Sequence, residues 1–394
     1  MRKVAILLAV FSLRAQTPLS PDLDALSKIR TRMIFNLEHQ PNYTCVETIE
    51  RSSRAKTTNK LKVVDTLRLE VALVDGREMF AWPGSKKFED SDVTKLVPRG
   101  AIGNGNFSTH AQALFEGRAA TFRYLGEEVF HGKKAIRFDY SVPQMLSGYR
   151  IRVAAASAIV AYHGSFYADP ATFDIERIEV IADDLPAVLL LSSTEDEIDY
   201  AVARIGDGDF LLPAESQLTM HDLNGSENQN HVKFTACRQF SGESVITFDD
   251  APGAKSDAAP VPIREFDLPA GIEVGLVLTE DIDLRTAAIG DQVHARVDRD
   301  VKQKGQLVIP KGATATGRIT RLERRDNFSL LGLSFPEIEA PGILARMQGI
   351  LTSVVGIVQP NRGGVTRLSL GEGLIPLSAS QRRLARGCIM IWRT

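Results

Sequence analysis

Histidines are the first residues to consider for metal chemistry, because neutral imidazole is a common zinc ligand. The chain has seven: His39, His110, His131, His163, His221, His231 and His294. No two of them have a His-x-His or His-Glu-x-x-His spacing, so no helix or strand is predicted to present paired imidazoles to one ion. His131 and His163 each precede a glycine, which is typical of a turn between strands. The sequence therefore predicts no metal site.

Motifs for nucleophilic or phosphate chemistry were sought next. The sequence has no Gly-x-Ser-x-Gly elbow that would expose a serine above a sheet. Residues 312–317 have the spacing of a phosphate-binding loop, but Arg318 and Ile319 stand where that loop needs lysine and a hydroxyl residue. We therefore predict no catalytic residues and no cofactor, so the protein is expected not to be an enzyme. An unrecognised envelope hydrolase is the minor alternative.

Acidic residues cluster at 195–197, at Asp207 and Asp209, and at 280–283. A calcium loop needs oxygen ligands at alternating positions, a central glycine and a closing glutamate. None of the three clusters has this pattern, so all are interpreted as solvated turns. A weak calcium site at 280–283 is the alternative.

The three cysteines allow at most one intramolecular disulfide. Cys45 and Cys237 lie in strand-like segments near the two ends of one region, whereas Cys388 is close to the C-terminus. We predict a structural disulfide between Cys45 and Cys237, which would stabilise the fold by roughly 5 kcal/mol on the chain-entropy model. Two unpaired buried thiols are the alternative, because sequence does not determine connectivity.

The N-terminus has the pattern of a signal peptide over residues 1–15. Arg2 and Lys3 precede an apolar stretch at 4–13, and Ala15 is a small residue at the expected cleavage point. The stretch is shorter than the roughly 20 residues of a membrane-spanning helix, and no later segment is long and apolar enough to span. We therefore expect a periplasmic or secreted protein without a transmembrane anchor after signal cleavage. A buried N-terminal helix is the alternative.

The composition of the sequence and the positions of its glycine, asparagine and proline residues indicate the architecture. The formal charge of −2 over 394 residues gives no positive field to attract nucleic acid. Apolar residues at helical spacing follow Pro21, and alternating segments with Gly and Asn turns then continue to about residue 248, which predicts one large curved antiparallel sheet. Three prolines at 251–262 predict a linker. The strand-rich segment 263–394 suits a small β-barrel or sandwich, so the fold class is mainly β (α+β).

The region 20–250 resembles the outer-membrane lipoprotein-carrier (LolA/RseB-like) superfamily. The resemblance rests on the N-terminal helix and long meander, on Phe166-Tyr167-Ala168-Asp169-Pro170 before a strand, and on Phe210-Leu211-Leu212-Pro213 before another. It implies a large curved antiparallel unclosed β-barrel with an N-terminal helix. No ligand-contact residue can be transferred from the family.

Part of 263–394 resembles the β-domain of TrbI-type conjugation and secretion channel subunits. The matching residues are Leu268-Pro269-Ala270-Gly271, Gly290-Asp291-Gln292-Val293, and Val308-Ile309-Pro310-Lys311-Gly312-Ala313 with Gly317-Arg318. The helical antenna and membrane anchor of those proteins are missing from the sequence. The resemblance therefore implies an interaction fold and not a channel.

The resemblances lead to a functional hypothesis. A curved unclosed sheet has a concave face that can hold an acyl chain or hydrophobic peptide. We predict an exported envelope protein whose first domain binds a lipid-like or lipoprotein-derived ligand and whose second domain binds an envelope protein partner. If Phe, Leu and Ile fill the concave face as plain core, the alternative is a structural or assembly module with no small-molecule ligand.

Overall fold

The computed structural model describes residues 20–394, except 59, 86–87, 89–92, 98–101, 103–106, 154–155, 241–262, 325–327, 356–369 and 379. The signal peptide expected at 1–15 and the linker expected at 251–262 lie outside the described residues. The chain is mostly β, with 60% of it in strands and 11% in helices. No helix within the described ranges is long and apolar enough to cross a membrane.

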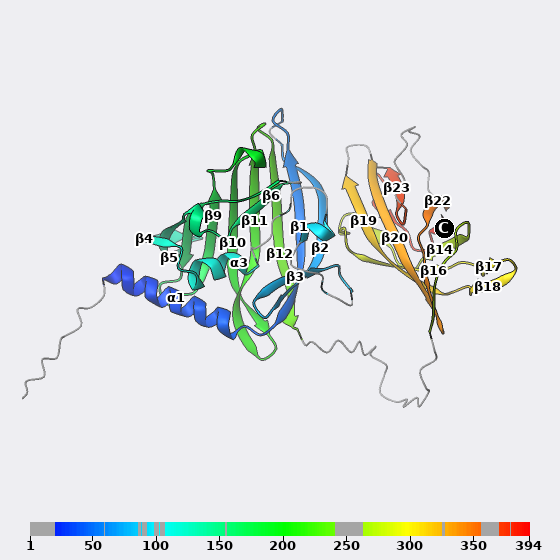
Figure 1. Cartoon of the computed structure of the whole chain (residues 1–394), viewed down its shortest axis with the longest axis horizontal. Coiled ribbons are helices and arrows are strands. Elements are labelled where there is room, and N and C mark those ends of the chain that lie inside the picture. The colour runs from blue at the N-terminus through cyan, green and yellow to red at the C-terminus, as the bar shows by residue number, and fades with distance from the viewer. Residues whose placement is uncertain are drawn as a thin grey trace, which may run out of the picture.

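Residues 43–239 form a curved sheet of ten antiparallel strands (Figure 1). Its spatial order is β3-β2-β1-β12-β11-β10-β9-β8-β5-β4, and its two edge strands, β3 and β4, do not pair with each other. The sheet is therefore an unclosed barrel, and the predicted fold class is confirmed. The strands are β1 (Tyr43–Arg54), β2 (Lys62–Val74), β3 (Arg77–Ala81), β4 (Thr121–Phe130), β5 (Lys133–Val142), β8 (Tyr162–Ala168), β9 (Ile175–Ala182), β10 (Leu191–Ile205), β11 (Gly208–Asp222) and β12 (Glu227–Gln239).

Helical segments and one hairpin complete the first region. Helix α1 (Pro21–His39) begins with proline at its first turn and buries Ile29 and Met33, as the predicted apolar spacing requires. The shorter segments are the helices α2 (Val93–Leu96), α3 (Thr109–Ala111), η1 (Gln112–Glu116), η2 (Gln144–Leu146) and η3 (Ala187–Leu189), and the hairpin strands β6 (Arg150–Val153) and β7 (Ala156–Ile159).

Residues 264–393 form a second sheet of nine strands, in the order β13-β21-β20-β19-β16-β14-β25-β22, with β23 paired to β20. Its core contains the fully buried Phe335 and Trp392. The strands are β13 (Arg264–Asp267), β14 (Glu273–Leu278), β16 (Gln292–Val297), β19 (Thr314–Arg324), β20 (Phe328–Ala340), β21 (Ile343–Arg346), β22 (Ile350–Val355), β23 (Gly373–Ser378) and β25 (Ile389–Arg393); two small ribbons pair β15 (Ile282–Asp283) with β24 (Arg383–Leu384) and β17 (Val301–Gln303) with β18 (Gln306–Ile309).

Two expected local structures are wrong. His163 and Gly164 lie inside β8 instead of forming a turn, whereas His131 and Gly132 do form one. The cluster at 195–197 lies in the middle of β10 and not in a solvated turn. A glycine or a run of acids favours a turn locally, but strand pairing on both sides of β8 and β10 overrides that preference.

The two sheets meet at the part of β2 that the short strand β3 leaves unpaired. Leu67 and Ile289 form a parallel bridge, in which the Arg68 amide donates to the Ile289 carbonyl (2.8 Å) and the Ile289 amide donates to the Thr66 carbonyl (2.7 Å). Arg68 also pairs with Asp291 across the contact. The second sheet therefore covers an edge that would otherwise expose backbone hydrogen-bonding groups.

Gly290 allows this contact. Its φ of +101° favours glycine, and a Cβ there would lie 2.3 Å from the Arg68 carbonyl oxygen and 2.6 Å from Trp82.

We expect Gly290→Ala to separate the sheets and increase the radius of gyration measured by small-angle X-ray scattering. Gly305→Ala is the matched control, because Gly305 also has a positive φ (+79°) but no neighbouring atom within 4 Å. Equal scattering from both variants would contradict a specific contact.

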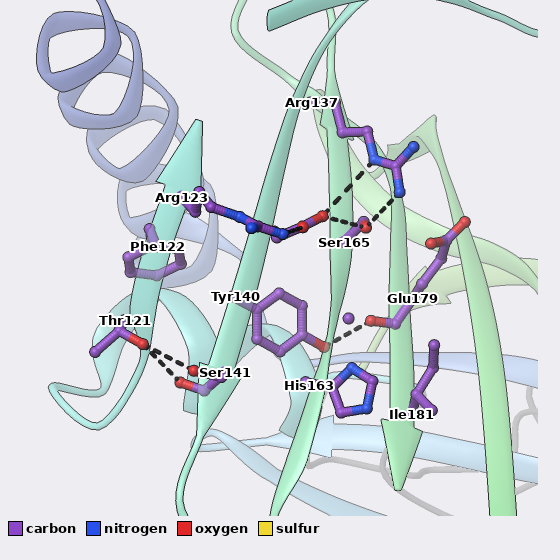
Figure 2. Close-up of a pocket in the computed structure, with 12 residues that line it drawn as sticks. Thr121, Phe122, Arg123, Arg137, Tyr140, Ser141, His163, Ser165, Glu179 and Ile181 are labelled. Atoms are coloured by element: carbon purple, nitrogen blue, oxygen red, sulfur yellow. Dashed lines mark hydrogen bonds and ion pairs between the residues drawn. The ribbon is translucent and has the colours of Figure 1, made fainter. Parts of the chain in front are cut away.

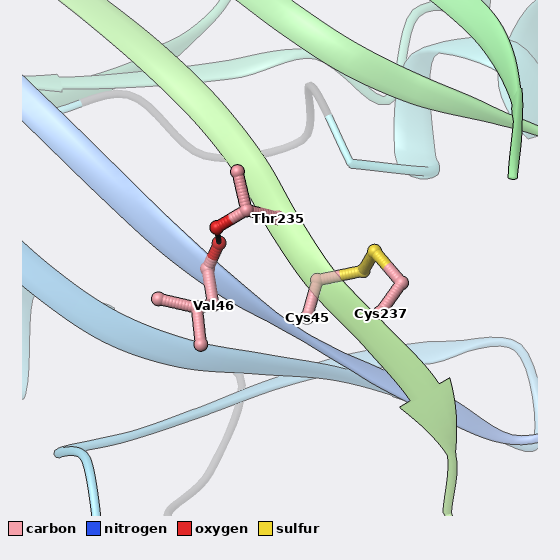
Figure 3. Close-up of a disulfide and its surroundings, with 4 residues drawn as sticks. All are labelled: Cys45, Val46, Thr235 and Cys237. Carbon is pink, nitrogen blue, oxygen red and sulfur yellow. Dashed lines mark hydrogen bonds between the residues drawn. A yellow bond between two sulfur atoms is a disulfide. The ribbon is translucent and has the colours of Figure 1, made fainter.

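A disulfide joins Cys45 of β1 to Cys237 of β12, the pair predicted from the sequence (Figure 3). The register between these strands shifts between Thr44 and Val46, and Ala236 has a φ of +49°. This bulge places the two cysteines 4.1 Å apart at Cα. Cys388 is a free thiol.

Removing the disulfide should destabilise the protein. The sequence separation of 192 residues corresponds to about 5 kcal/mol on the chain-entropy model, which gives an upper figure for the double variant Cys45→Ala, Cys237→Ala. Cys388→Ala is the control and should change the free energy of unfolding by no more than about 1 kcal/mol. Chemical denaturation measures both; a double variant as stable as the control would show that the bond contributes nothing.

Candidate functional site on the concave face

The concave face of the ten-stranded sheet is predominantly apolar, because alternate residues of each strand point to it. On β5, β8 and β9 the inward residues form one buried cluster with α1. Toward β1 and β2 the inward residues form a second cluster with Phe107. The inward apolar residues of the first cluster include Ile136, Phe138, Phe166, Ile178 and Val180; those of the second include Ile49, Leu67, Leu69, Val71 and Phe234.

Helix α1 and the segment 107–116 cover this face. Arg30 of α1 donates to the backbone carbonyl of Phe115 (3.0 Å), which ties the helix to η1. The side chain of Asn36 donates to the Leu211 carbonyl (2.7 Å) and accepts from the Leu211 amide (2.9 Å), which fixes the helix to β11. A few polar contacts therefore hold a cover that is otherwise attached by apolar packing.

Aromatic rings occupy much of the space beneath the cover. Phe115 meets Phe166 edge to face at 5.3 Å, and Phe166 stacks on Phe138 at 5.3 Å. Phe107 lies 5.2 Å from Tyr43 and 5.0 Å from Phe234, measured between ring centroids. These rings continue the core from the sheet into the cover.

Several buried carboxyl groups interrupt the apolar face, among them Asp65, which pairs with Arg51. Glu47 of β1 lies between the inward-facing Cys45 and Ile49, and Asp196 lies on β10. Glu47 Oε2 and Asp196 Oδ1 have no hydrogen-bond partner among the described residues. Burial, with a contribution from Glu78, raises the pKa of Glu47 to about 8; burial, with a contribution from Glu197, raises the pKa of Asp196 to about 7.

Another carboxylate positions the cover. Oε1 of Glu78 on β3 accepts hydrogen bonds from the amide and hydroxyl groups of Ser108 (2.8 and 3.1 Å) and of Thr109 (both 3.0 Å). These donors stand where α3 begins, so Glu78 anchors the start of the covering segment.

His110 is buried directly after this anchor. Its ring lies edge-on to Tyr149 (5.0 Å) and Tyr162 (6.5 Å), and burial lowers its pKa to about 4. The ring is therefore neutral at physiological pH. Within the described ranges, no three His, Cys, Asp or Glu side chains are grouped so that they could hold a metal ion.

The outer face of the same sheet has a shallow hollow over β4, β5, β8 and β9 (Figure 2). Asp139 and Ser165 occupy its centre: the Ser165 hydroxyl donates to Asp139 (2.9 Å) and accepts from Arg137 (3.1 Å), and Arg123 pairs with Asp139. Because these polar groups satisfy one another, the hollow is explained as a cross-strand network that stabilises the sheet.

Sequence reasoning did not identify the buried acids. Glu47 shares the alternation of Cys45 and Ile49, and this phase was the signal that could have found it. Asp196 was included in an expected solvated cluster, but it points inward from β10 while the side chains of Glu195 and Glu197 do not. The cluster at 280–283 is engaged instead with basic groups: Glu280 contacts His294, Asp281 contacts Arg383, and Asp283 contacts Arg285.

No protein-family model matches the sequence, and no curated protein matches it. Several solved structures are similar to this chain, among them the following three. A lipoprotein-sorting protein domain from Vibrio parahaemolyticus has 13% identity and a TM-score of 0.33, with coverage of 56% of this chain and 94% of its own. A DUF1329 family protein from Desulfovibrio piger has 11% identity and a TM-score of 0.32, with coverage of 57% and 96%. The lipoprotein LppX from Mycobacterium tuberculosis has 9% identity and a TM-score of 0.20, with coverage of 55% and 97%.

Because the TM-scores are low, the fold assignment rests on the strand order and the unpaired sheet edges and not on these similarities. The TrbI-type resemblance of the second region stays a prediction.

The buried acids should make stability depend on pH. Since the pKa of Glu47 is raised from 4.5 to about 8, the folded protein retains a proton that the unfolded chain releases. Its contribution to stability is fully present below about pH 4.5 and is lost as pH rises toward 8, with a slope on the order of 1.4 kcal/mol per pH unit. Glu47→Gln should flatten this slope, most visibly between pH 7 and 8, where Asp196 contributes less.

Chemical denaturation across pH 5–8.5 measures the effect. Glu50→Gln is the control, because Glu50 lies on the same strand but is exposed. An unchanged slope in Glu47→Gln would show that Glu47 is ionised in the folded protein.

Proposed function

We propose that this chain is an exported, non-catalytic cell-envelope protein that holds a lipid-like or lipoprotein-derived group against its concave face. The observation that carries the proposal is that the sheet of the first region is covered on one face only. A ten-stranded open sheet presents one apolar face, and one helix, a short segment and the hairpin β6–β7 cover it instead of a second large sheet. A cover of this kind can move away from the sheet without breaking strand pairing.

The polar contacts of the cover support this proposal. Arg30 and Asn36 hold α1 mainly through backbone carbonyl groups of other elements, and Arg32 pairs with Asp174, the residue before β9. Such contacts can be released and remade at modest cost, since a typical hydrogen bond contributes only about 1 kcal/mol net. An acyl chain could replace part of the packing between the cover and the sheet.

We also propose that the second sheet binds an envelope protein. The edge strands of this sheet are β13 and β22, and neither pairs with a second strand among the described residues. An unpaired edge can accept a strand from a partner chain. The disulfide supports export, because such bonds persist in oxidising compartments such as the periplasm or the exterior.

A structural or assembly module without a small-molecule ligand is the second candidate. The stacked and edge-to-face rings of Phe107, Phe115, Phe138 and Phe166 favour it, because they already fill space between the sheet and the cover. This candidate predicts a protein that is purified without lipid.

Native mass spectrometry of the protein purified from its own envelope fraction separates the two candidates. We expect an added lipid mass that organic extraction removes, and saturable binding of the probe N-phenyl-1-naphthylamine after extraction. A bare mass together with no saturable probe binding would overturn the carrier-like proposal.

Loosening the cover provides a residue-level test. Arg30→Ala removes the hydrogen bond from α1 to the Phe115 carbonyl and should speed probe release about threefold or more, since one lost hydrogen bond is worth about 1 kcal/mol. Asp24→Ala is the matched control on the same helix, because its ion pair with Lys28 lies within α1 and does not hold the helix to another element. Stopped-flow dilution measures the release rates; equal rates would exclude entry under this part of the cover.

A further inference from the structure

One end of the ten-stranded sheet has an apolar rim, which we define as Met145, Leu146, Ile159, Val188, Leu190 and Leu223. These residues belong to the segments that connect strands of the sheet. The pairing of the strand ends places these segments at the same end of the sheet, because Arg54 is opposite Glu227, Leu191 is opposite Asp222, and Val142 is opposite Tyr162. In Figure 1 this is the upper end of the sheet, where the connection between β1 and β2 lies. All six side chains are exposed, and Met145 is 97% exposed.

Hydrogen bonds and packing contacts join the rim into one surface. Gln144, next to Met145, donates to the Ile159 carbonyl (2.8 Å), and β7 packs against η3, which contains Val188. The Leu223 amide donates to the Leu190 carbonyl (2.9 Å). Leu190 also has a φ of +56°, a conformation that a leucine rarely adopts, and this conformation accompanies an exposed side chain.

The hairpin β6–β7 lies between the rim and the concave face. Its residues Ile151, Val153, Ala156 and Ala158 pack on the buried cluster beneath the sheet, while Ile159 and its cross-strand partner Arg150 face the other way. The rim therefore lies outside the opening of the concave face. The hairpin β6–β7, which has one face on the buried cluster and the other toward the rim, separates the rim from the concave face.

Positive charge flanks the rim. The exposed Arg150 is opposite Ile159, and the aliphatic part of Lys56 contacts the turn at Gly225, next to Leu223. Neither Arg150 nor Lys56 has an ion-pair partner among the residues that the structure describes. Of four acids at this end, Glu227 pairs with Arg54, Asp183 contacts His163, Asp222 accepts a hydrogen bond from Ser226, and Asp184 is exposed.

We propose that the apolar rim docks on the surface of an anionic lipid bilayer. Protruding aliphatic side chains can enter the boundary of the acyl region, while Lys56 and Arg150 remain at the level of the headgroups. A protein partner is less favoured, because protein interfaces depend mainly on Trp, Tyr and Arg anchors and the six rim side chains include no aromatic ring. The inference does not depend on whether the concave face holds a ligand.

Vesicle flotation tests the proposal with the full exported protein. We expect it to float with vesicles of phosphatidylglycerol and phosphatidylcholine, and to float less with phosphatidylcholine alone. The double variant Met145→Ser, Leu146→Ser should weaken binding to the anionic vesicles about tenfold or more, because it removes two inserted side chains. The double variant Lys56→Glu, Arg150→Glu should abolish the preference for anionic vesicles.

Matched controls come from the opposite end of the sheet. Val129→Ser and Lys134→Glu change an equally exposed valine and lysine there and should leave flotation unchanged. Melting temperatures of all variants should match the parent, since each changed side chain is exposed.

Two results would overturn the proposal: no flotation of the parent with anionic vesicles, or equal loss in rim and control variants. If the rim variants instead lose a purified envelope protein partner while the parent never floats, the rim is a protein-docking surface. Because flotation is measured on lipid-extracted protein, failure here leaves the probe-binding test of the concave face unaffected.

Discussion

The concave face of the ten-stranded sheet must be kept from water, and this requirement explains most of the structure around it. An open sheet has no opposite wall, so α1, the segment 107–116 and the hairpin β6–β7 supply one from three separate parts of the chain. Each of them is covered with apolar side chains on the face toward the sheet. Examples are Ile29 and Met33 on α1, and Ile151 and Val153 on the hairpin. Apolar burial drives this arrangement, while hydrogen bonds such as those of Asn36 set its position.

The strand order determines where the chain is held together. The first strand, β1, lies inside the sheet between β2 and the last strand, β12, so the two ends of the first region are neighbours. The Cys45–Cys237 disulfide joins these strands at a bulge, and Ile289 of the second region pairs with the free part of β2. Covalent and backbone contacts thus gather on the neighbouring strands β12, β1 and β2.

The buried acids show that the interior is not only a packed core. Burying an ionised carboxylate is costly, so burial raises the pKa of Glu47 to about 8 and that of Asp196 to about 7, and near neutral pH Glu47 is mostly protonated and Asp196 partly so. Glu78 has a different role, because four donors at the start of α3 satisfy it. Carboxyl groups on one face of one sheet therefore differ in role because their partners differ.

Local pattern in the sequence determined the helix at the N-terminus, the alternation of the long strands and the mainly β class, and it favoured Cys45 and Cys237 as a disulfide pair without determining their connectivity. Periodicity carries that information, because side chains at 3.6- or 2-residue spacing share one face wherever the element is placed. Tertiary structure alone decided that His163 and Gly164 lie within a strand, that Ile289 reaches β2, and that six separate aliphatic residues meet at one rim. Each of these depends on which distant segment lies alongside, and no local spacing encodes that choice.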